Sequence, residues 1–237
     1  MAGNDKDLPQ KSSRAAIDAF VDRVRSAPVI KPAGERGRLI FAMDATASRE
    51  PTWDQACQIQ GEMFSTTAAL GGLDIQLCYY RGFGEFEASP WLSSADTLLQ
   101  RMTSVSCRGG HTQIEKVLEQ AMAQTRQQKV QALVFVGDCM EEDADHLCHL
   151  AGQLSVLGLP VFLFHEGDEP VAARSFKEIA RLTRGAYCAF DAGSAAQLRD
   201  LLSAVAVYAA GGRKALGDFS QQRGGLLPQL ARQLGKD

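Results

Sequence analysis

The ten residues LIFAMDATAS, at positions 39–48, decide the fold prediction. Their first half, Leu39–Met43, is a continuous apolar run, which is typical of a strand buried on both faces of a parallel sheet. A polar stretch begins at Asp44, directly after this run. Three more short apolar runs have the same character, and they cover residues 132–136, 161–164 and 186–190.

Longer segments with helical periodicity separate these runs, because their apolar residues recur about every 3.6 positions. These segments are residues 53–68, 114–122, 147–157, 176–183 and 198–205. The alternation predicts a Rossmann-like three-layer α/β/α sandwich with a mostly parallel central sheet. Two strand-like runs, 75–80 and 85–88, are joined by only four residues. Such a short connection requires an antiparallel hairpin, so the sheet should carry one antiparallel edge strand.

The length of 237 residues, 45% of them apolar, suits one globular domain with short extensions. We expect this domain, in the α/β class, to cover residues 37–210. Residues 1–36 form an N-terminal extension with a short helix near 15–25. Residues 211–237, which begin with two glycines, are interpreted as a loosely attached tail.

Composition excludes several classes of protein. The 25 Lys and Arg residues nearly balance 28 Asp and Glu residues, which gives no electrostatic reason to expect broad nucleic-acid binding. No apolar stretch is long enough for a membrane helix, and the polar N-terminus lacks the apolar region of a signal peptide. Six scattered cysteines without a close pair predict buried, reduced thiols. We therefore expect a cytoplasmic protein.

Oxygen-bearing side chains cluster where the predicted strands end. Asp44, Thr46 and Ser48 alternate along the loop after the first strand, and Asp138 follows another strand. Thr112 follows Gly-Gly-His directly before a predicted helix. Ligands of open α/β sheets bind at the carboxyl ends of the strands. Carboxylate and hydroxyl oxygens suit a hard cation, so the set predicts a site for Mg²⁺ or Mn²⁺.

In this order and context, the residues resemble the von Willebrand factor type A (VWA) family and its metal-ion-dependent adhesion site, Asp-x-Ser-x-Ser, then Thr, then Asp. Asp44, Thr46 and Ser48 match the first element, with a threonine in place of one serine. Thr112 matches the Gly-Gly-x-Thr turn, and Asp138 the last aspartate. The resemblance implies that the hydroxyls bind the metal, Thr112 directly or through water. It also implies that the two aspartates orient metal-bound water, and that a partner's carboxylate completes the coordination.

The resemblance extends over about residues 37–208, but the sequence departs from the family pattern after Asp138. The family usually has glycine there, whereas this chain has Cys139 and then an acidic cluster. The added negative charge would raise cation affinity and repel an acidic partner. We expect His111, Cys139 and Glu141 to form the partner-binding rim of the site.

Other interpretations of the same residues stay open. Thr112 and Glu115 have the spacing of a capping box, and Asp44 and Ser48 could be turn or cap residues. A further set contains residue types that bind zinc, although no close cysteine pair supports it. That set is Cys139, His146, Cys148 and His149.

The expected function is a non-enzymatic, divalent-cation-dependent protein-binding module. One alternative is a magnesium-dependent phosphatase or phosphoryl acceptor that uses Asp44 as nucleophile. Haloacid-dehalogenase-like phosphatases need a second aspartate where Thr46 stands, and receiver domains need a lysine where His165 follows a late strand. A second alternative is a scaffold that binds partners without metal.

Overall fold

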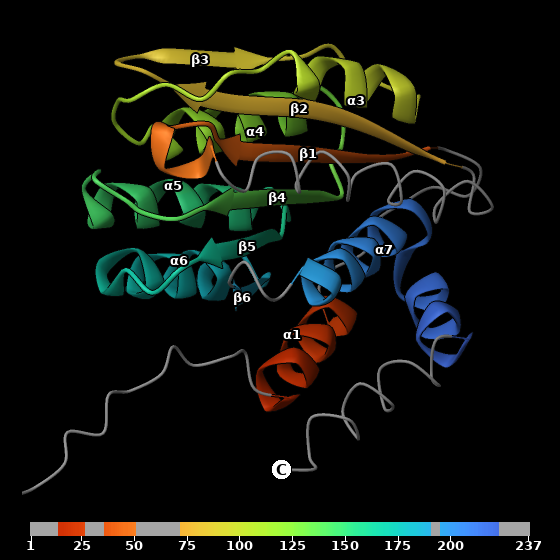
Figure 1. The fold of residues 1–237 in the computed structure, drawn as a ribbon. Helices are drawn as coiled ribbons and strands as arrows, with labels where there is room; N and C mark the ends of the chain where they lie inside the picture. Colours follow the sequence, from red (N-terminus) through yellow and green to blue (C-terminus); the bar gives the residue numbers. More distant parts are fainter. Residues whose placement is uncertain (1–13, 27–35, 51–71, 191–194, 223–237) are drawn as a thin grey trace, which may run out of the picture.

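The computed structural model describes residues 14–26, 36–50, 72–190 and 195–222. A six-stranded sheet in the order β3-β2-β1-β4-β5-β6 forms its centre (Figure 1). The strands are β1 (Gly37–Asp44), β2 (Leu73–Arg81), β3 (Glu85–Ala88), β4 (Ala132–Gly137), β5 (Val161–Glu166) and β6 (Ala186–Phe190). Every neighbouring pair is parallel except β2 and β3, which form the predicted hairpin at one edge. The predicted mixed sheet is therefore confirmed.

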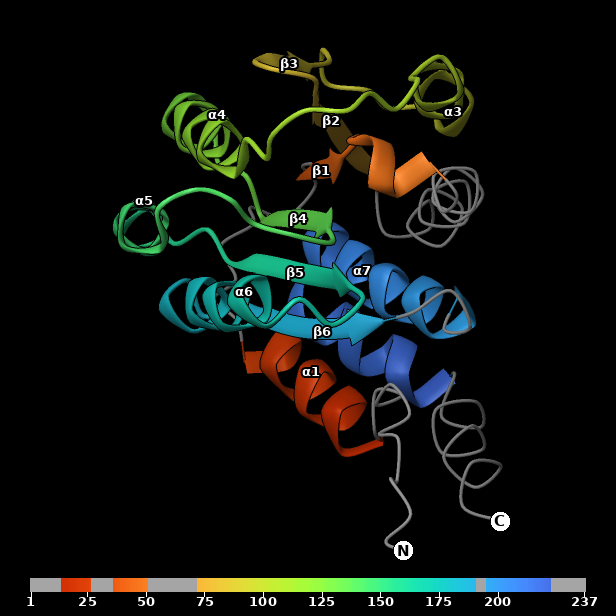
Figure 2. The same ribbon diagram turned by 60° about the vertical axis from the view of Figure 1, so that its left-hand side comes forward.

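Helices cover both faces of the sheet (Figure 2). One face carries α4 (Ile114–Gln127), α5 (Ala144–Val156) and α6 (Pro170–Leu182). The other face carries α1 (Arg14–Ser26), α3 (Ala95–Thr103) and α7 (Ala195–Gln222). Alternate residues of β1 point to opposite faces, so Phe41 packs into the α1 side and Ile40 into the α4 side. The helix predicted over residues 53–68 lies outside the described residues.

Both terminal helices contribute to the main core. Phe20 of α1 is buried, and its ring centroid lies 5.3 Å from that of Phe164 in β5. At the other end, α7 continues past residue 210, where the sequence suggests a tail, and reaches Gln222 through a kink at Gly212. Gly212 has a φ of 72°, which glycine adopts without steric cost. The glycine pair therefore bends the last helix.

The five described cysteines are free thiols, two buried and three partly exposed. Among the described residues, no helix combines the length and apolar character needed to cross a membrane.

Candidate functional site

Two aspartates meet at the carboxyl end of the sheet because β1 and β4 run side by side. Met43 pairs with Val136, so Asp44, the last residue of β1, lies opposite the end of β4. Asp138 follows β4 directly. Ligand atoms of Asp44, Asp138 and Cys139 all lie within 4.8 Å of one another. The fold therefore brings together the two carboxylates that the sequence predicts.

The loop after β1 holds Asp44 in a fixed position. Its side chain is completely buried, and Oδ1 accepts a hydrogen bond of 2.7 Å from the backbone N–H of Thr46. The Tyr80 hydroxyl donates to Oδ2 at 3.1 Å. Burial raises the pKa of Asp44 to about 6, although the hydrogen bonds from Thr46 act in the opposite direction. The Thr46 and Ser48 hydroxyls lie 3.1 Å apart, and Ser48 is exposed.

Asp138 carries a carboxylate oxygen that could bind a cation. Its Oδ1 is buried and has no hydrogen-bond partner among the described residues. A buried acceptor lowers the stability of the fold unless a hydrogen-bond donor or a bound ion pairs with it. Burial, nearby carboxylates and a hydrogen bond to the Asp138 side chain raise the pKa of the Cys139 thiol to about 12, so the thiol stays protonated at neutral pH. The remaining donors are oxygens, which fit a hard cation such as Mg²⁺ or Mn²⁺.

Thr112 binds the acidic loop that follows β4. Its hydroxyl donates to the Glu142 carboxylate and accepts from the backbone N–H of Glu141 at 2.9 Å. The other Glu142 oxygen accepts from the N–H of Ile114, the first residue of α4. The possible capping box is therefore not formed, because Glu142 satisfies the start of the helix. Glu115 instead contacts His146, 3.0 Å away.

The expected rim residues lie in two places, one beside Thr112 and one beside the two aspartates. His111 and Glu141 are in contact, with Nδ1 3.2 Å from the carboxylate, whereas Cys139 lies beside the aspartates. The His111 ring also packs edge-on against Phe83 of the β2–β3 turn, with centroids 5.1 Å apart. Phe83 is 82% exposed, so an apolar surface adjoins the acidic one. The sequence analysis predicted neither the contact between His111 and Phe83 nor the hydrogen bond from Tyr80 to Asp44.

Arg49 is a further member of the site that the sequence analysis missed. It ends η1 (Ala47–Arg49), and its side chain is only 2% exposed. The guanidinium forms an ion pair with Glu166, at the end of β5. Burial lowers the pKa of Arg49, while the carboxylates of Asp138 and Asp44 act to raise it. A positive charge of the chain itself therefore lies near both aspartates, and the signal was a basic residue directly after Ser48.

His165 connects the site to the last strand. Its Nε2 lies 3.0 Å from the backbone oxygen of Asp138, and its Nδ1 lies 2.9 Å from the Tyr187 hydroxyl. A carbonyl oxygen only accepts, so Nε2 carries the proton and Nδ1 accepts from Tyr187. Burial lowers the pKa of His165, which favours this neutral form. The possible zinc set does not assemble among the described residues, since His149 contacts Gln153 instead.

Comparisons with known proteins give a fold but no sequence family. No family model matches the chain, and no curated protein matches it. Solved structures do match: the VWA domain of SpRpn10 aligns with a TM-score of 0.56 at 13% identity, over 75% of this chain and 98% of that chain. The chain has a von Willebrand factor type A fold.

Two further matches agree with the VWA fold. A von Willebrand factor type A structure from Catenulispora acidiphila has a TM-score of 0.58 at 14% identity, over 73% of this chain and 43% of that chain. The human COPII-coat protein Sec24c has a TM-score of 0.56 at 13% identity, and the match covers 71% of this chain and 32% of that chain. Identities this low establish the VWA fold alone, and the predicted metal site stays a prediction.

Proposed function

We propose that this VWA domain is a non-enzymatic protein-binding module that captures its partner through Mg²⁺ or Mn²⁺. The buried, unsatisfied Oδ1 of Asp138 beside Asp44 is the observation that carries the proposal. The cation would be held by Asp44, Thr46, Ser48, Thr112 and Asp138. The fold suggests an interaction module, and matched structures of the same fold include a pilus adhesin and a COPII-coat protein.

The chemistry of the donors explains how a partner would be held. The hydroxyls of Thr46 and Ser48 are neutral, so a cation bound by them keeps positive charge for a carboxylate of the partner. Thr112 would have to exchange the Glu142 carboxylate for the cation. Glu142 therefore competes with the cation for the Thr112 hydroxyl.

The geometry favours binding over phosphoryl transfer. A nucleophilic carboxylate must reach the phosphorus atom of its substrate. Asp44 is completely buried, and both of its oxygens already accept hydrogen bonds, from Thr46 and Tyr80.

We also propose a cytoplasmic location, which the free thiols support.

A metal-independent scaffold is the second candidate, and Arg49 is the observation that favours it. Its charge lies near Asp44 and Asp138 and could balance them without a metal. In that case, partner binding would not respond to a chelator.

Calorimetric titration of Mg²⁺ and Mn²⁺ separates the two candidates. We expect saturable binding that is lost in Asp138→Asn and Ser48→Ala. The matched control Asp96→Asn, which changes an exposed carboxylate on α3, should bind as the native protein does. Absence of binding by the folded native protein would contradict a preformed cation site and favour the scaffold.

A further inference from the structure

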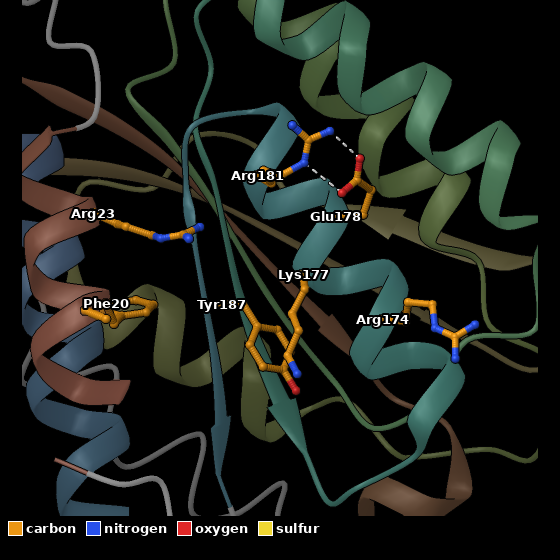
Figure 3. Close-up of a pocket in the computed structure, with 8 residues that line it drawn as sticks. Phe20, Arg23, Arg174, Lys177, Glu178, Arg181 and Tyr187 are labelled. Atoms are coloured by element: carbon orange, nitrogen blue, oxygen red, sulfur yellow. Dashed lines mark hydrogen bonds and ion pairs between the residues drawn. The ribbon is translucent and has the colours of Figure 1, made fainter. Parts of the chain in front are cut away.

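A cavity of about 730 Å³ opens beside β6, between α1 and α6 (Figure 3). It is lined by Ala19, Phe20, Arg23, Arg174, Lys177, Glu178, Arg181 and Tyr187. None of these residues belongs to the candidate metal site. Pockets of this size hold drug-sized ligands or a few side chains of a partner.

Positive charge dominates the lining. Arg174, Lys177 and Arg181 recur at intervals of three and four residues and form one stripe along α6. Arg23 approaches from α1, on the opposite side of the cavity (Figure 3). A concentration of cations in a chain of net charge −3 indicates an anionic ligand.

One carboxylate already occupies part of this stripe. Glu178 holds Arg181 through two hydrogen bonds of 2.5 and 2.8 Å. In the described part of the chain, Arg23, Arg174 and Lys177 form no ion pair with a carboxylate, and all three are exposed. Arg23, Arg174 and Lys177 are therefore available to an incoming acid. The Glu178 pair also shows that a carboxylate fits against this stripe.

The apolar part of the cavity favours a peptide over a nucleic acid. Nucleic-acid sites combine cations with aromatic rings on which bases stack. Here the ammonium of Lys177 lies 5.2 Å from the Tyr187 ring centroid, and Phe20 is only 1% exposed. Neither ring therefore offers an open face to a base. The stripe from Arg174 to Arg181 rises about 10 Å along the helix, which matches roughly three residues of extended peptide.

We propose that this cavity binds an acidic, extended peptide segment of a partner protein. Carboxylates of the segment pair with Arg23, Arg174 and Lys177, and its apolar side chains lie toward Ala19. The binding uses side chains of this chain alone and requires no metal. It therefore stands apart from the proposed cation-dependent function.

Fluorescence anisotropy of a labelled eight-residue peptide of alternating Glu and Ala tests the proposal. The full chain is titrated in the presence of EDTA, so a failure of the cation site does not affect the result. We expect saturable binding that weakens with added salt, and no binding of the matched peptide of alternating Gln and Ala. Absence of binding of the acidic peptide to the folded chain overturns the proposal.

Two substitutions that reverse the charge of a lining residue test whether the peptide binds in this cavity. Arg174→Glu and Lys177→Glu should each weaken binding at least tenfold. Arg126→Glu, the same change at an exposed position of α4, should leave it within twofold. Thermal unfolding checks that each variant is folded. Equal binding by the reversals and the control places the peptide elsewhere and overturns the proposal, as does tighter binding of a single-stranded DNA of equal length.

Discussion

Arg49 and Glu166 form an ion pair that spans the end of β4 and joins the loop after β1 to the end of β5. Their side chains are only 2% and 16% exposed. Asp138, the residue that follows β4, lies within the electrostatic reach of this guanidinium. The pair therefore connects three neighbouring strands at the end of the sheet where the candidate site lies.

Replacing Arg49 by methionine should destabilise the chain and increase the stabilisation that Mg²⁺ gives. The change leaves Glu166 and the two aspartates without their buried cation, which typically costs about 3–5 kcal/mol. Added Mg²⁺ should recover part of this loss, because it supplies the missing charge. Urea unfolding with and without Mg²⁺ measures both effects. Arg101→Met, at an exposed position, should change stability by less than about 0.5 kcal/mol, and an Arg49 variant of native stability would contradict the prediction.

The two glycines before His111 should differ sharply in their tolerance of alanine. A Cβ at Gly110 would overlap the backbone carbonyl of Gly82 in the β2–β3 turn, whereas a Cβ at Gly109 meets nothing within 4 Å. Gly110→Ala should therefore lower the free energy of unfolding by about 2 kcal/mol or more. Gly109→Ala should be neutral or slightly stabilising. Equal stabilities of the two variants in denaturant unfolding would show that this close approach does not exist.

Glu142 should stabilise the start of α4. Its carboxylate accepts from the Ile114 N–H and from the Thr112 hydroxyl, so Glu142→Ala leaves both donors without this acceptor. The expected loss of unfolding free energy is about 1–2 kcal/mol. Glu87→Ala, which removes an exposed carboxylate from β3, is the matched control. The prediction fails if both variants unfold at the same denaturant concentration.

Cys78 should resist alkylation in the native protein. Burial raises the pKa of its thiol to about 12, so only about one molecule in 10⁴ carries the reactive thiolate at pH 8. At pH 8, iodoacetamide should therefore label Cys78 at least a hundredfold more slowly in the native chain than in urea, where an ordinary thiol pKa returns. Peptide mass spectrometry reports the modified position. Labelling of native Cys78 at the unfolded rate would exclude this burial.

Local patterns were sufficient to predict the sheet. The runs 39–43 and 161–164 are apolar throughout, which identifies strands covered on both faces. The four-residue connection between 80 and 85 permitted only a hairpin. The N-terminal helix was predicted, but its place in the core was not, because only the packing of Phe20 against Phe164 reveals it.

The candidate site was predictable only where its contacts are local in sequence or fixed by the sheet. The alternation of Asp44, Thr46 and Ser48 places them on one loop, and the parallel pairing of β1 and β4 brings Asp138 to Asp44. The contact of Glu142 with Thr112 joins residues that are thirty positions apart. Such contacts depend on loop conformation and side-chain rotamers, which spacing does not encode.

The hydrogen bonds of His165 connect a residue that lines the cavity with the backbone of Asp138. Tyr187 lines the cavity, and its hydroxyl donates to Nδ1 of the imidazole whose Nε2 donates to the backbone oxygen of Asp138. In a double-mutant cycle, Tyr187→Phe and His165→Phe should be non-additive in unfolding free energy, by about 0.5 kcal/mol or more, because the two side chains share a hydrogen bond. Coupling of this kind is reciprocal, so a peptide that tightens cation binding would itself be bound more tightly, by the same factor, when the cation is present. One neutral histidine is thus the hydrogen-bonded link between the two proposed ligand sites.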